Sequence, residues 1–100
     1  MALRLELWAR GRIIDGAEIW WDDVELALSG DAGEALPTLR RVDPYGDTLF
    51  GVSELDELAR EARQLRVQAS ASARPLLDRL VDLCSTGMSE ADAQLRIVGD

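Results

Sequence analysis

The residue types that most often carry out catalysis are scarce in this chain. It contains no histidine, which removes the commonest general base and the commonest metal ligand. Cys84 is the single cysteine, so neither an internal disulfide nor a cysteine-rich metal site can form. Nineteen acidic residues could pair for acid–base chemistry as in glycosidases, but at this density pairs arise by chance. We therefore predict that the protein is not an enzyme and uses no cofactor.

One short segment has the residues of a cation site. Residues 43–48 read Asp-Pro-Tyr-Gly-Asp-Thr, and oxygen ligands at alternate positions suit calcium. The segment lacks the further acids and the closing glutamate of a known calcium loop. Its order instead matches a type I turn, with Asp first, Pro second and Gly fourth. We predict a turn in which Asp43 bonds nearby amides, and no metal site.

Acidic residues surround a pair of tryptophans near the start of the chain. Trp20 and Trp21 lie within a stretch that has no basic residue from Ile13 to Leu39. An exposed tryptophan beside acids has the composition of an interface hot spot, although both rings could instead cover the core. On a strand the two rings would point to opposite faces. The stretch contains seven carboxylates: Asp15, Glu18, Asp22, Asp23, Glu25, Asp31 and Glu34.

The charge of the whole chain limits its partners. The net charge is −8, and residues 1–59 account for all of it, with thirteen acids against five arginines. Such a surface repels nucleic acid and attracts basic proteins; a solubilising role alone is the alternative. No apolar run approaches the roughly 20 residues that cross a membrane, and no signal peptide is evident. We expect a cytoplasmic protein without membrane or nucleic-acid partners.

The N-terminal part predicts extended structure followed by a short helix. Alternation from Leu3 to Leu7 predicts a half-buried strand, and a turn at Gly11 leads to a second extended segment. Asp15-Gly16 is a hairpin or turn signal, after which residues 17–21 continue as strand. Asp22 or Asp23 could then cap a helix that runs through Leu28, although a strand is also compatible with that segment.

The C-terminal part predicts two helices and a final strand. Residues 54–67 have helical apolar spacing behind a capping box at 53–56. A second helix follows, with Pro75 in its first turn and Gly87 as its stop. Two helices with a short link usually form an antiparallel pair. Alternation at Leu95 and Ile97 predicts a last strand beside the first.

Together these elements predict one α+β domain over residues 1–100. A small antiparallel sheet, made of the N-terminal strands and the C-terminal strand, packs on one face against an antiparallel helix pair.

Three segments carry a resemblance to known proteins: Trp-Trp-Asp-Asp at 20–23, Asp-Pro-Tyr-Gly-Asp-Thr-Leu-Phe at 43–50, and Ile-Val-Gly-Asp at 97–100. The chain resembles a group of small acidic actinobacterial proteins of about this length that have no assigned activity. In size and charge such proteins are similar to immunity proteins, which neutralise bacterial toxins by binding them.

These observations predict a non-catalytic binding module, namely an immunity protein or inhibitor that binds the basic face of a toxin or defence enzyme. The predicted contact residues are Trp20, Trp21, Asp22, Asp23, Asp43, Tyr45 and Asp47. One alternative is a homodimer that associates through apolar surface left on the helix pair 54–86. Another is a small carboxylate enzyme.

Overall fold

The computed structural model describes residues 2–30 and 34–99. The chain begins with a hairpin of β1 (Ala2–Ala9) and β2 (Arg12–Trp20). Its turn is at Arg10 and Gly11, which both have positive φ, 54° and 76°, as a type I′ hairpin turn requires. The turn that the sequence places at Gly11 is therefore confirmed.

The turn predicted at Asp15-Gly16 is wrong. Both residues lie inside β2, next to a β-bulge opposite Leu7 and Trp8. A Cβ on residue 16 would lie 2.9 Å from the carbonyl oxygen of Leu5, so the glycine permits a close backbone approach rather than a chain reversal.

Two later strands complete the sheet. β3 (Asp47–Gly51) and β4 (Gln94–Val98) join the hairpin in the order β2-β1-β4-β3, and every neighbouring pair is antiparallel. The last strand therefore lies beside the first, as the sequence predicts. β3 is a further strand that the predicted fold did not count.

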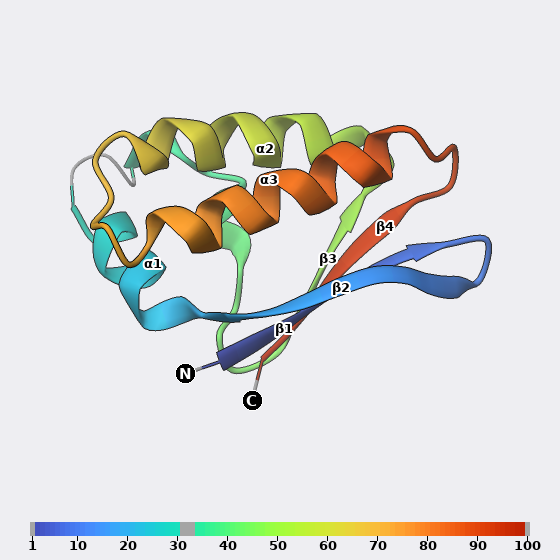
Figure 1. Cartoon of the computed structure of the whole chain (residues 1–100), viewed down its shortest axis with the longest axis horizontal. Helices are drawn as coiled ribbons and strands as arrows, with labels where there is room; N and C mark the ends of the chain where they lie inside the picture. The colour runs from blue at the N-terminus through green and yellow to red at the C-terminus, as the bar shows by residue number, and fades with distance from the viewer. Residues whose placement is uncertain (1, 31–33, 100) are drawn as a thin grey trace.

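Among the described residues, three α-helices accompany the sheet. The long helices α2 (Val52–Arg66) and α3 (Arg74–Met88) pack side by side across one face, and the short α1 (Trp21–Leu28) lies at the end of that layer where β2 stops (Figure 1). A 3₁₀ turn, η2 (Leu39–Arg41), lies between α1 and β3. The predicted α+β fold with a packed helix pair is thus confirmed.

The helix ends differ from their predicted signals. The helix α2 begins two residues early, and Glu54 Oε1 accepts the Gly51 N–H at 3.1 Å, so the predicted capping box at Ser53 is wrong. At α1, neither Asp22 nor Asp23 is the cap; both lie in the first turn, where carboxylates favour the helix dipole. Gly87 lies inside α3 and is buried, so it is not the helix stop.

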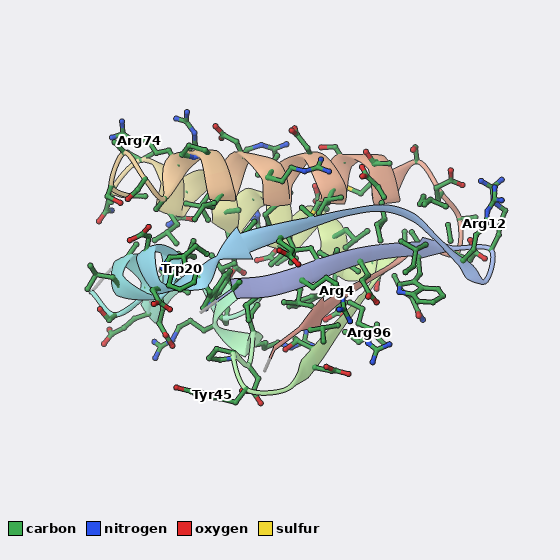
Figure 2. All side chains as sticks on the ribbon, turned by 60° about the horizontal axis from the view of Figure 1, so that its bottom comes forward. Arg4, Arg12, Trp20, Tyr45, Arg74 and Arg96 are labelled. Atoms are coloured by element: carbon green, nitrogen blue, oxygen red, sulfur yellow. The ribbon has the colours of Figure 1, made fainter. Side chains whose placement is uncertain are left out.

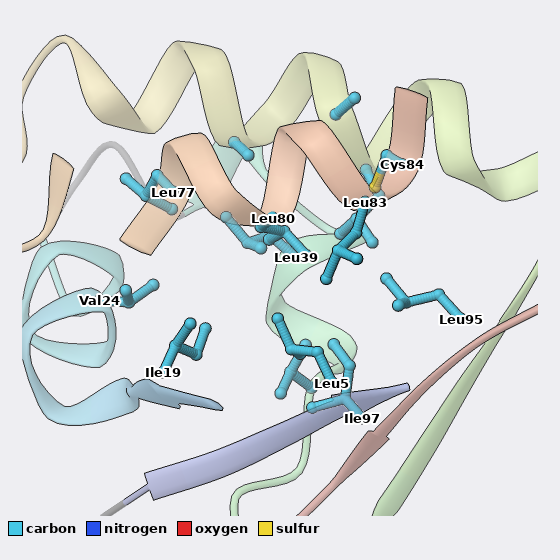
Figure 3. Close-up of a cluster of buried hydrophobic side chains, with 14 of the residues drawn as sticks. Leu5, Ile19, Val24, Leu39, Leu77, Leu80, Leu83, Cys84, Leu95 and Ile97 are labelled. Atoms are coloured by element: carbon cyan, nitrogen blue, oxygen red, sulfur yellow. The ribbon is translucent and has the colours of Figure 1, made fainter. Parts of the chain in front are cut away.

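The core lies between the sheet and the two long helices (Figure 3). Leu5 of β1 and Ile97 of β4 rise from the sheet toward Leu80 and Leu83 of α3. At one end, Ile19 and Val24 extend the core to α1. The described helices cover one face of the sheet and leave the other without a helix (Figure 1). None of the helices that the structure describes is both long and apolar enough to cross a membrane.

Candidate functional site

The two tryptophans of the acidic segment have opposite environments. Trp20 is the last residue of β2 and 53% exposed, whereas Trp21 opens α1 and is 2% exposed. Alternation along β2 directs Ile19 into the core and Trp20 outward, and Trp21, the first residue of α1, faces the core again. Trp21 therefore belongs to the core, which corrects its prediction as a contact residue: it has no exposed ring to offer.

Several carboxylates lie within a few residues of Trp20 in the chain. Asp22 is exposed and Asp23 half-buried in the first turn of α1, one turn before the exposed Glu25, and Glu18 lies two residues before Trp20 on β2. Within residues 2–30 and 34–99, Glu18, Asp23 and Glu25 take part in no ion pair. By contrast, Asp15 is paired with Arg79 at 3.1 Å. Three carboxylates without an ion pair among the described residues are thus grouped on β2 and α1, on either side of Trp20 in the chain. Asp31 lies outside the described residues.

The remaining predicted contact residues, Asp43, Tyr45 and Asp47, lie in or directly after the expected turn. Asp43 Oδ1 accepts the Tyr45 N–H at 2.9 Å, and the Asp43 carbonyl accepts the Gly46 N–H at 3.3 Å. Asp47 is paired with Arg96 at 2.6 Å. Both carboxylates therefore have structural partners, while the Tyr45 ring is 73% exposed. No group of three or more metal-ligating side chains is found in the part of the chain that the structure describes.

The sheet brings Trp20 and the turn with Tyr45 to one end of the molecule, but to opposite edges of the sheet. Ala2 pairs with Trp20, and Val98 pairs with both Arg4 and Asp47. Three strand spacings, about 14 Å, separate the edge strand with Trp20 from the edge strand with Asp47. Figure 2 shows Trp20 and Tyr45 toward the same end, with Arg12 at the other. A partner would have to be larger than a single peptide strand to touch both.

One surface was not anticipated as a site: the face of the sheet opposite the helices. Ile13 and Leu49 are half exposed there, and Trp8, Leu49 and Arg96 line a hollow of about 450 Å³ together with Asp47 and Gln94. In the centre of the face, Glu6 is only 8% exposed. The alternation in residues 2–8 indicates which side chains share this face, but no sequence signal shows that it stays uncovered.

Both oxygens of Glu6 have donors. Arg4 Nε donates to Glu6 Oε2 at 2.8 Å, and Trp8 Nε1 donates to Glu6 Oε1 at 3.1 Å. All three residues come from β1, so alternate positions of one strand form the cluster. The buried carboxylate is thereby satisfied, as burial of a charge requires.

Cys84 is not a candidate nucleophile. It is fully buried on the core side of α3, and desolvation raises the pKa of its thiol to about 12. The thiolate, which is the reactive form, is therefore scarce near neutral pH.

Comparison with known proteins finds no matching family model and no significantly similar curated protein or solved structure. The resemblance to small acidic actinobacterial proteins accordingly stays a prediction.

Proposed function

We propose that this chain is a non-catalytic binding module for a protein with a basic face, of the kind that inhibits a toxin or a defence enzyme. The observation that carries the proposal is the exposed indole of Trp20 among the carboxylates of β2 and α1. Tryptophan is among the residues most enriched at interface hot spots, and the neighbouring carboxylates suit a partner with a basic face.

The carboxylates near Trp20 act mainly on the approach of the partner, before the two surfaces are in contact. Among the residues that the structure describes, Glu18, Asp23 and Glu25 form no ion pair, so a cationic partner gains attraction without breaking one of the described ion pairs. Concentrated charge of one sign accelerates encounter. The ring then supplies apolar contact at short range.

The contact set that we propose is smaller than the one predicted from sequence. Trp20, Asp22 and Asp23 form its centre, and Tyr45 is a second, separate contact across the sheet end. Asp43 and Asp47 hold the turn that presents Tyr45, so their effect on binding is indirect.

Affinity capture from a native extract tests the proposal, with Trp20→Ala and Asp22→Arg as variants. Trp20→Ala should reduce capture of a basic protein by about tenfold or more, since truncating an anchor typically costs at least about 2 kcal/mol. Asp22→Arg should also reduce capture, because it places a positive charge against the basic face of the partner. The matched control is Asp82→Arg, which makes the same charge change at an exposed site on α3.

The comparison between variants decides the result. If Asp82→Arg reduces capture as much as Asp22→Arg does, only net charge matters and no site exists at α1. If Trp20→Ala leaves capture unchanged, the ring is not an anchor and the proposal fails.

A further inference from the structure

The uncovered face of the sheet reaches the acidic end at Glu18 and Trp20, which pair with Arg4 and Ala2 across the sheet, but its centre differs from that end in its charge. Besides apolar side chains it carries the ion pairs Arg4–Glu6 and Arg96–Asp47. Positive and negative groups nearly balance there, so this face does not select strongly for a basic partner. It suits a surface with the same mixed character.

Association through the edges of the sheet is obstructed. On edge strand β2, Arg79 Nη2 donates to the Gly16 carbonyl at 2.7 Å, and the bulge beside it disrupts the regular ladder. On edge strand β3, Arg41 Nη2 lies 3.5 Å from the Leu49 carbonyl. Bulges and edge-pairing charges are common ways to prevent strand addition. The face, not the edge, is the available surface.

The helix layer is also a poor surface for self-association. Its outer side carries ion pairs such as Arg66–Asp78 and Arg60–Glu57. The dimer predicted through the helix pair 54–86 would have to bury these charges.

The outward side chains of β1 are complementary to themselves in reverse order. From one end they are Ala2, Arg4, Glu6 and Trp8. When a second β1 lies over the first in the opposite direction, Arg4 meets Glu6 of the other copy, and the small Ala2 meets the large Trp8. A parallel arrangement would instead place Arg4 over Arg4 and bring the two acidic ends together.

The neighbouring strands agree with the reversed arrangement. Arg96 and Val98 of β4 pair across the sheet with Glu6 and Arg4, and Leu49 and Asp47 of β3 continue the same two rows. Reversal places Asp47 over Leu49 of the other copy, next to that copy's Arg96. Attractive contacts therefore extend over three strands.

We propose that the uncovered face binds a second copy of this chain, with the two sheets face to face and their β1 strands antiparallel. Arg4 and Glu6 of both copies form a closed ring of alternating charges at the centre. The acidic α1 ends lie at opposite ends of the dimer, where they repel least. This inference does not rest on the proposed function, but the second copy and a partner at Trp20 would compete, because Trp20 lies beside Ala2 on the same face.

The size of the face limits the affinity. Four strands spaced about 4.8 Å apart, with four rows about 6.8 Å apart, give a face of about 500 Å². Stable interfaces bury about 800 Å² per partner. We therefore expect a dimer that forms at high micromolar protein and dissociates on dilution.

Sedimentation velocity over a micromolar to millimolar concentration series tests this inference. The parent chain should show a monomer–dimer equilibrium, and Arg4→Glu should weaken it by about tenfold or more, because residue 4 then faces Glu6 of the other copy. The double variant Arg4→Glu with Glu6→Arg restores both the internal and the intermolecular pair and should recover the dimer. Leu49→Glu should weaken it through repulsion with Asp47 of the other copy.

Arg74→Glu is the matched control, because it makes the same charge change on α3, in the helix layer away from Arg4 and Arg96 (Figure 2). It should leave the equilibrium nearly unchanged. Circular dichroism verifies that each variant is folded, and Leu49→Glu keeps the test decisive if Arg4→Glu does not fold. A parent chain that is monomeric at every concentration overturns the inference, as do face variants that dimerise like Arg74→Glu.

Discussion

Adjacent residues of the same type have different roles in this protein, as the tryptophan pair shows. Trp21 is fully packed, so Trp21→Ala should lower the free energy of unfolding by about 3–5 kcal/mol. Trp20→Ala should lower it by about 1 kcal/mol or less, as for most exposed sites, while it weakens partner capture. Urea unfolding of the two variants provides the comparison. Equal losses of stability would mean that Trp20 is a core residue and not an anchor.

The buried thiol gives a second prediction at the scale of single residues. Desolvation raises the pKa of Cys84 from 9.0 to about 12, so the folded chain keeps the thiol neutral over a range in which the unfolded chain ionises it. The contribution of Cys84 to stability is complete below pH 9 and is lost as the pH rises toward about 12. A thiol reagent at neutral pH should therefore react slowly with the folded chain and fully in urea. Fast reaction without urea would contradict its burial.

At the scale of elements, one buried carboxylate connects the irregular segment before β3 to helix α2. Glu61 is 3% exposed, and its two oxygens accept the backbone N–H groups of Thr38 at 3.2 Å and Leu39 at 2.9 Å. Removing this acceptor leaves two N–H groups without a partner, which typically costs about 1–3 kcal/mol per buried group.

Glu61→Ala should therefore lower the free energy of unfolding by about 1–3 kcal/mol or more, with Glu61→Gln in between because its amide oxygen still accepts one bond. Thermal or urea unfolding measures the change. Glu57→Ala is the control: it removes an exposed partner of Arg60 on the same helix and should cost about 1 kcal/mol or less. Equal effects of the two alanine variants would show that Glu61 does not hold the segment.

How far the sequence predicts these elements depends on the range of the interactions that determine them. The strands around Leu5 and Ile97 and the two long helices follow from apolar periodicity, which reflects burial directly. Local signals failed where a distant contact decided the outcome. Gly87 resembles a helix stop, yet a Cβ there would lie 2.6 Å from Leu55 Cδ1, so it is needed for packing between α3 and α2. The turn prediction at Gly16 failed for a similar reason, because that glycine permits a close approach to the backbone of Leu5.

The candidate site shows the same limit. The sequence identifies the acidic segment and leaves open which tryptophan is exposed, because that depends on which face of β2 the helices cover. The Arg96–Asp47 pair of the uncovered face requires the register of β3 and β4, since the two residues are distant in the chain. No local pattern contains that information.

At the scale of the whole molecule, the net charge of −8 acts oppositely on the two proposed interactions. It attracts a basic partner over long range, and salt screens that attraction, with a Debye length of about 8 Å at physiological ionic strength. The same charge makes two copies repel each other, so salt should strengthen the dimer, whose close ion pairs are screened less.

We therefore predict opposite salt dependences. Raising the ionic strength from about 0.01 M to about 0.15 M should slow association with a captured basic partner by about tenfold or more, since steering is the part of binding that salt removes. Over the same range the dimer should become tighter. Stopped-flow fluorescence measures the first effect and sedimentation velocity the second. An association rate that salt leaves unchanged would remove the steering role of α1. A dimer that salt weakens as strongly as the partner complex would mean that exposed charges, rather than the closed ring of Arg4 and Glu6, hold the copies together.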